Sequence, residues 1–114
     1  MKHPVSILSE RIRVDQLASR KTSAGKRVGL VCTALDGEQV RFSWSKDGKI
    51  LLSGERISIL SSGESSMLSI KDIRLEDGGN YTCIASNALS EDRTSATLQV
   101  EGESSKEAFQ SARV

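Results

Sequence analysis

The chain has 114 residues, of which 27% are charged and 37% hydrophobic, and a formal net charge of +1. This length fits one domain, and the composition is typical of a small globular protein. A net charge so close to zero gives no overall attraction to nucleic acid. With two cysteines and one histidine, the chain cannot form a cysteine-histidine zinc cluster or a knot of several disulfides.

Positive charge is concentrated at the start of the chain. Residues 1–27 carry seven basic and two acidic side chains, and residues 28–114 carry nine basic and thirteen acidic ones. The basic segment would dock on an anionic sugar or lipid surface, or it would form a solvated edge strand that lysine and arginine protect against strand addition. We favour the second interpretation, since edge strands are commonly protected in this way.

The two ends lack the pattern of the middle. Residues 1–13 predict an N-terminal extension or a first short strand, and residues 102–114 predict a polar tail or linker. The domain is therefore expected to span residues 14–101. No apolar run predicts a secretory signal near Met1 or a membrane span, so we expect membrane attachment only through other parts of a longer protein. A removed signal, an excised domain and an intracellular protein all fit.

Alternation of apolar and polar side chains dominates the middle of the chain. It predicts strands, because successive side chains of a strand point to opposite faces. The alternating stretches are residues 28–34, 40–45, 68–71, 81–86 and 96–100, and the turn signals between them include Asp36–Gly37, Asp47–Gly48, Gly63 and Gly78–Gly79. Short strands at this spacing predict an all-β, two-sheet antiparallel sandwich or barrel.

Cys32 and Cys83 lie on the inward positions of two of these strands, 51 residues apart. If they bond, they would tie one sheet to the other. Closing a loop of this size would stabilise the fold by about 4 kcal/mol. Trp44 follows Cys32 by twelve residues and would pack against that bond.

These residues carry a family resemblance. Cys32, Trp44, Leu68-x-Ile70 and Asp77-x-Gly79-x-Tyr81-x-Cys83 resemble the immunoglobulin pattern. The short interval between Trp44 and Leu68 is most similar to the I-set, and the phrases around Trp44 and Tyr81 resemble neural cell-adhesion and Dscam-type domains. The resemblance implies a Greek-key sandwich with one inter-sheet disulfide between Cys32 and Cys83, and a core built on Trp44, Leu68, Ile70 and Tyr81.

The same resemblance gives structural roles to the residues before the second cysteine. Tyr81 is expected to form a tyrosine corner, with its hydroxyl bonded to nearby backbone. Asp77 is expected to pair with Arg56, and Gly79 to allow a tight corner. Asn80-Tyr81-Thr82 is an N-glycosylation sequon, and Asn80 alternates outward, so it would carry a glycan if the chain is secreted.

Catalysis has little support in the sequence. The single histidine, His3, lies in a predicted tail, and the adjacent acidic residues fit solvated loops better than an acid-base pair. The glycine-containing turns do not join a strand to a helix, so they do not predict a phosphate-binding loop. We therefore expect no enzyme activity, no cofactor and no metal site.

We predict a protein-recognition module of a cell-surface adhesion molecule or receptor, extracellular, with the same or related immunoglobulin chains as partners and a weak homodimer as one outcome. The alternatives are a structural module of an intracellular muscle scaffold in the sarcomere, and a heparin-binding extracellular domain. A polar surface suits a modest interface better than a deep pocket. The two candidate surfaces are the outward residues Arg41, Ser43 and Ser45, and the edge near Arg93, Thr94 and Ser95.

Overall fold

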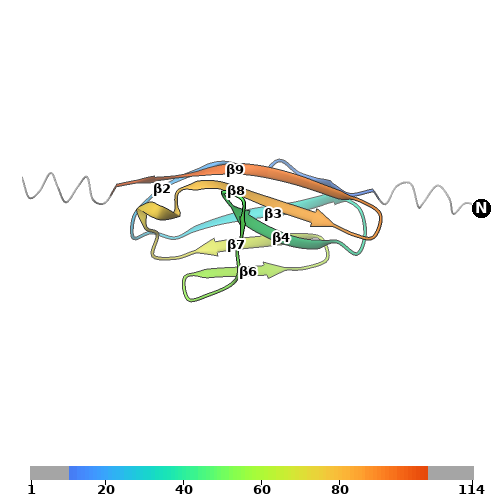
Figure 1. Cartoon of the computed structure of the whole chain (residues 1–114), viewed down its shortest axis with the longest axis horizontal. Helices are drawn as coiled ribbons and strands as arrows, with labels where there is room; N and C mark the ends of the chain where they lie inside the picture. Colours follow the sequence, from blue (N-terminus) through green and yellow to red (C-terminus); the bar gives the residue numbers. More distant parts are fainter. Residues whose placement is uncertain (1–10, 103–114) are drawn as a thin grey trace, which may run out of the picture.

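The alternating segments form two sheets that pack face to face, as the computed structural model of residues 11–102 shows (Figure 1). One sheet has four strands in the order β1 (Arg13–Val14), β3 (Val28–Asp36), β7 (Ser65–Ile70) and β6 (Ile57–Ser61). The other has five, in the order β2 (Arg20–Ser23), β9 (Glu91–Glu101), β8 (Gly79–Ser86), β4 (Arg41–Lys46) and β5 (Lys49–Ile50). The predicted two-sheet sandwich is confirmed.

The core lies between the sheets and surrounds a disulfide. Cys32 of β3 is bonded to Cys83 of β8, with the two Cα atoms 6.4 Å apart. Both cysteines and Trp44 are completely buried. The remaining core side chains come from the inward positions of both sheets and include Leu30, Leu68, Ile70, Tyr81 and Leu98. The predicted inter-sheet disulfide is therefore confirmed.

A hydrogen bond also crosses the core. The indole Nε1 of Trp44, in β4, donates to the hydroxyl of Ser66, in β7, at 2.9 Å. Ser66 is 1% exposed, and its hydroxyl lies 2.7 Å from the hydroxyl of Ser61 in β6. A buried indole N–H needs an acceptor, so a serine on the opposite sheet fixes the orientation of the central aromatic ring.

The first part of the chain is divided between the sheets. β1 pairs antiparallel with β3, whereas β2 pairs with β9 in parallel. The other six strand pairs among the described residues are all antiparallel, so this parallel pair is a departure from the antiparallel sandwich that the alternation predicted. β2 lies at the edge of its sheet and exposes Arg20 and Lys21, which are residues of the basic leading segment.

The core includes a residue that the sequence placed outside the domain. Ile12 is 5% exposed and packs with Val40 and Ala85 in a small second cluster of the core. Its backbone N–H donates to the hydroxyl of Ser90 at 2.8 Å. Most of the predicted extension (1–10), His3 included, and most of the predicted tail (103–114) lie outside the described residues.

The bond between Trp44 and Ser66 gives a test of the core. Ser66→Ala removes the acceptor of a buried indole N–H, so we expect the free energy of unfolding to fall by about 1–3 kcal/mol. Urea denaturation measures this change. The matched control is Ser69→Ala on the same strand, which is expected to change stability by less than about 0.5 kcal/mol because Ser69 is only half-buried. Equal midpoints for the two variants would show that the indole bond contributes nothing.

Candidate interaction surfaces

A shielded ion pair closes one end of the sandwich. Arg56 lies just before β6, and Asp77 ends the short 3₁₀ helix η1 (Leu75–Asp77). The guanidinium donates twice to the carboxylate, at 2.8 Å and 3.1 Å. The Asp77 side chain is 10% exposed and that of Arg56 is 22% exposed. Two parallel charge-assisted bonds fix both position and orientation.

The same carboxylate also organises the corner before β8. Asp77 accepts a hydrogen bond from the backbone N–H of Arg74 at 2.7 Å, and its backbone carbonyl accepts one from the hydroxyl of Tyr81. Burial alone would raise the pKa of Asp77, but the hydrogen bonds from Arg56 and from the Arg74 backbone lower it further than burial raises it. The net pKa of Asp77 is therefore below its ordinary value. Desolvation, and then the negative charge of Asp77, raise the pKa of Tyr81.

Arg56→Ala is expected to lower the free energy of unfolding by about 1–3 kcal/mol at neutral pH, because it leaves a largely buried carboxylate without its counter-ion. The pKa of Asp77 is depressed in the folded chain, so the pair stabilises the fold above the ordinary carboxyl pKa and loses this effect as the pH falls through the folded pKa. Denaturation midpoints of both chains across the acid range measure the difference, which should shrink below pH 3.8, the ordinary value.

The control for this prediction is Arg93→Ala. Arg93 pairs with Glu91 at 2.8 Å, but both side chains are about half exposed or more. Exposed pairs contribute roughly 0–1 kcal/mol. A loss at Arg56 no larger than the loss at Arg93, or a loss that does not change with pH, would contradict a stabilising role for the shielded pair.

The position of Gly79 has no room for a side chain, because the Asp47 side chain of the β4–β5 turn fills the space beside it. The φ of Gly79 is +156°, and a Cβ there would lie 2.6 Å from the Asp47 carboxylate. That carboxylate accepts a hydrogen bond from the backbone N–H of Asn80 at 2.9 Å, which, with the neighbouring Lys46, lowers the pKa of Asp47. The β4–β5 turn thereby joins the start of β8. The Asn80 side chain itself is exposed.

The outer face of the five-stranded sheet is polar. It carries Arg41 and Ser43, which are exposed as predicted from the alternation, and Arg93 of the second candidate surface, which is also exposed. Ser45 was predicted to face solvent with them, but it is 8% exposed. It lies between Ile50 on β5 and Thr82 on β8, and a short serine side chain is covered by such neighbours. Ser45 is therefore not part of an accessible surface.

The second candidate surface, the edge near Arg93, also differs from the prediction. Thr94 is 7% exposed, because it points inward from β9 with Ala96 and Leu98, and its hydroxyl accepts the backbone N–H of Leu17 at 2.8 Å. Further along the same edge, Asp92 accepts the backbone N–H of Val14 at 3.0 Å. The chain between β1 and β2 thus covers this part of β9, and Ser95 stays exposed on the outer face, bonded to Thr82 at 2.7 Å.

The outer face of the four-stranded sheet has a different character. Val31, Met67 and Leu60 lie directly opposite one another on β3, β7 and β6 and are 54%, 41% and 71% exposed. None of the outward positions of these three strands carries a charge; they are Gly29, Val31, Thr33, Leu35, Ser58, Leu60, Ser65, Met67 and Ser69.

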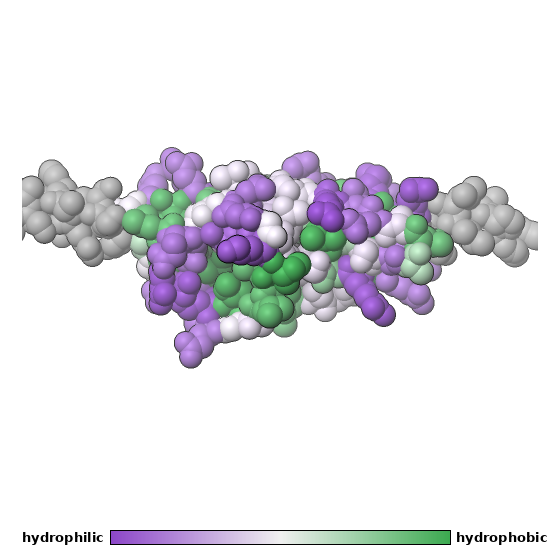
Figure 2. Space-filling model, viewed as in Figure 1, coloured by the Kyte–Doolittle hydropathy of each residue, from purple (hydrophilic) through white to green (hydrophobic). Residues whose placement is uncertain are grey.

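This apolar row was not predicted from the sequence. The signal was present, because Val31, Met67 and Leu60 each interrupt the alternation next to an inward apolar residue. Only the strand register, however, shows that the three interruptions coincide. Figure 2 shows another apolar area, over the connection between β4 and β6, where Ile50 is 61% and Leu52 is 77% exposed.

Within residues 11–102, no cluster of three or more histidine, cysteine or acidic side chains is arranged to hold a metal ion. No helix in the same stretch has the length and hydropathy needed to cross a membrane.

The sandwich, its central disulfide and the tyrosine corner are the features of the family that the sequence matches. Residues 13–100 match the family described as the immunoglobulin I-set domain. The chain belongs to this family. The predicted resemblance is confirmed, and an I-set domain is a non-catalytic module.

The similar I-set proteins include a cell adhesion molecule, myopalladin and titin. The chain is 40% identical to the mouse cell adhesion molecule DSCAML1 over 58% of this chain and 3% of that protein. It is 36% identical to mouse myopalladin over 82% of this chain and 7% of that protein. The titin M3 domain superposes with a TM-score of 0.73 and 30% identity, over 81% of this chain and 98% of that one. The chain thus spans a small part of the curated relatives.

Proposed function

We propose that this I-set domain is a protein-recognition module of a cell-surface adhesion molecule or receptor. The observation that carries the proposal is the uncharged outer face of β3, β7 and β6, with Val31, Met67 and Leu60 exposed in one row. In a chain with 27% charged residues, an extended face without any charge is unusual. Exposed apolar groups bordered by polar ones mark interaction sites on soluble domains.

The strand edges favour a face over an edge as the contact surface. The exposed edge of β6 is occupied by Ser53 and Gly54, which bond to Ile59 and Ile57 at 3.2 Å and 2.8 Å. The edge of β3 is partly occupied by Asp15, whose N–H donates to Thr33 at 2.9 Å. At the edges of the four-stranded sheet, addition of a partner strand therefore has little free backbone to use.

We assign a second copy of the domain as the occupant of this face. Two identical uncharged surfaces do not repel each other, as two like-charged ones would. Arg27 and Lys71 extend the face at one end, and the exposed Glu64 lies in the turn at the other. Antiparallel stacking about a two-fold axis would bring Glu64 of one copy towards these cations of the other, as an isologous contact requires.

The contact would be weak. Nine outward residues form the face, fewer than the roughly 20–30 a side of a standard interface. Adhesion by a weak contact depends on arrays of domains, in which effective concentration replaces affinity. A free domain would then be largely monomeric while densely displayed copies adhere.

The compartment is supported by two features. The Cys32–Cys83 bond is of a kind that persists in oxidising surroundings, and the exposed Asn80 lies in a glycosylation sequon. A relative named as a cell adhesion molecule adds to this support. The second candidate, a structural module of an intracellular muscle scaffold, is favoured by the similarity to myopalladin and to a titin domain.

Met67→Lys tests the proposed contact, because it places a charge at the centre of the apolar row. We expect beads that display the wild-type domain densely to aggregate and beads with the variant to stay dispersed, since two buried like charges repel. Sedimentation of the free domains at millimolar concentration gives a second measure of association.

Ser43→Lys on the opposite face and Leu52→Lys in the β4–β6 connection are the matched controls, and both are expected to leave aggregation unchanged. If either of them disperses the beads and Met67→Lys does not, the contact lies on another surface and the assignment is wrong. If wild-type beads never aggregate and no dimer sediments, homophilic adhesion by this domain is wrong, and a heterophilic or spacer role replaces it.

Asn80→Gln tests the proposed compartment. When the chain is directed through the secretory pathway of cultured animal cells, we expect an N-glycosidase to increase its electrophoretic mobility, and we expect Asn80→Gln and Thr82→Ala to lack this shift. Thr82→Ser keeps the sequon and serves as the control. A wild-type chain without a glycan would remove the sequon as support for an extracellular location. Since Asn80 lies on the outer face of the five-stranded sheet, opposite Thr97, a glycan there would leave the apolar row uncovered.

A further inference from the structure

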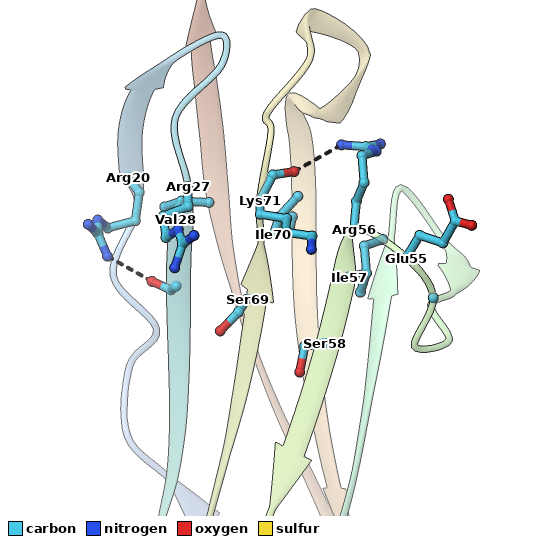
Figure 3. Close-up of a pocket in the computed structure, with 12 residues that line it drawn as sticks. Arg20, Arg27, Val28, Glu55, Arg56, Ile57, Ser58, Ser69, Ile70 and Lys71 are labelled. Carbon is cyan, nitrogen blue, oxygen red and sulfur yellow. Dashed lines mark hydrogen bonds between the residues drawn. The ribbon is translucent and has the colours of Figure 1, made fainter.

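A groove of about 380 Å³ lies at one end of the four-stranded sheet, next to the apolar row (Figure 3). It is formed where β3 and β6 begin and β7 ends, and Arg20 reaches it from β2 in the other sheet. Four basic side chains line it, and Glu55 is the one acidic residue among the lining residues. The basic residues are Arg20, Arg27, Arg56 and Lys71.

The register places three of these cations side by side. Val28, Ile70 and Ile57 lie directly opposite one another across β3, β7 and β6. The next position on each strand is Arg27, Lys71 and Arg56, and the N–H of Lys71 donates to the carbonyl of Arg56 at 3.0 Å. Because neighbouring strands are about 4.8 Å apart, the three residues form a row across the strand ends. Figure 3 shows Arg20 continuing it beyond Arg27.

The cations differ in how far they are already paired. Arg20 donates to the carbonyl of Gly29 at 2.7 Å, and Arg56 bonds to Asp77. The side chains of Arg27 and Lys71 are exposed and, among residues 11–102, make no ion pair or hydrogen bond of their own. Two unpaired cations therefore lie beside two whose positions are fixed.

Small residues leave the space between these side chains open. Gly29 has no side chain, and a Cβ added there would meet only the Leu68 carbonyl, at 3.9 Å. Ser58 and Ser69 lie beside it on the neighbouring strands. In the described part of the chain, neither serine hydroxyl has a hydrogen-bond partner. The groove thus combines a row of positive charge with free hydroxyl groups.

We propose that this groove binds a sulfated polysaccharide of the cell surface or matrix. The positive charges are spread along a row and do not converge on one point, so they match anionic groups spaced along an extended chain better than a single phosphate. The apolar lining residues Val28, Ile57 and Ile70 are buried or half-buried and offer nothing for insertion into a membrane. The serine hydroxyls would bond to sulfate or sugar oxygens.

This site differs from the basic segment of residues 1–27 that the sequence shows. Arg20 and Arg27 belong to that segment, but Arg56 and Lys71 come from elsewhere in the chain and join them only in the folded domain. The site does not rest on the proposed self-association, and it is tested at concentrations at which sedimentation shows monomers.

The test is titration calorimetry with a heparin octasaccharide. Arg27→Ala/Lys71→Ala removes the two unpaired cations, and we expect the affinity to fall about tenfold, with a weaker dependence on salt. The matched control is Arg41→Ala/Lys49→Ala, which removes the same residue types and the same charge from the exposed surface of the other sheet. We expect its affinity to change less than about twofold. Equal losses in the two variants would show only general charge attraction and overturn the site.

Gly29→Val tests whether the shape of the groove matters independently of its charge. The backbone of Gly29 is not in a positive-φ conformation and the new side chain meets little, so thermal denaturation should show an intact fold. Filling the groove at unchanged net charge should still weaken heparin binding severalfold. An unchanged affinity in Gly29→Val would overturn the proposal. The proposal would also be overturned if anionic lipid vesicles, or inorganic sulfate alone, bound with the same dependence on Arg27 and Lys71 as heparin.

Discussion

The bond between Cys32 and Cys83 is the constraint on which the rest of the sandwich depends. It joins the central strand pairs of the two sheets, with Trp44 completely buried in the same core. In a domain this small the apolar core alone gives limited stability. A covalent link between residues 51 positions apart lowers the conformational entropy of the unfolded chain and so stabilises the fold. The indole bond from Trp44 to Ser66 then fixes how the sheets face each other.

A second constraint comes from the start of the chain, which crosses from one sheet to the other. From β1 towards β2, the backbone N–H groups of Val14 and Leu17 donate to side chains of β9, and the hydroxyl of Ser19 accepts the N–H of Thr97 at 3.0 Å. These side-chain bonds take the place of a regular ladder. They protect an edge of β9 that would otherwise accept another strand. The crossing therefore leaves this part of β9 without a free edge for a partner strand.

The faces differ in chemistry, and each difference follows from the register. The five-stranded sheet presents hydroxyls and scattered charges together with the sequon at Asn80. The four-stranded sheet presents an uncharged face with Val31, Met67 and Leu60 at its centre and a basic row at one end. A glycan at Asn80 would lie on the opposite sheet from the other two proposed ligands. A second copy of the domain and a sulfated polysaccharide would overlap at Gly29, Ser58 and Ser69 and at the cations Arg27 and Lys71. The ion pair of Arg56 with Asp77 connects the basic row to the tyrosine corner.

The sequence by itself determined the sandwich, because the inward positions of its strands recur with period two and because Cys32, Trp44, Tyr81 and Cys83 stand at family spacing. Local alternation also predicted that Ser45 faces solvent, which is wrong, because neighbouring strands cover it. The candidate edge near Arg93 included Thr94, which instead lies on the inward face of β9 with Ala96 and Leu98. The apolar row and the basic row were decided by the tertiary structure alone. Their members are far apart in the chain, and a residue's neighbours across a sheet are set by strand pairing, which alternation does not specify.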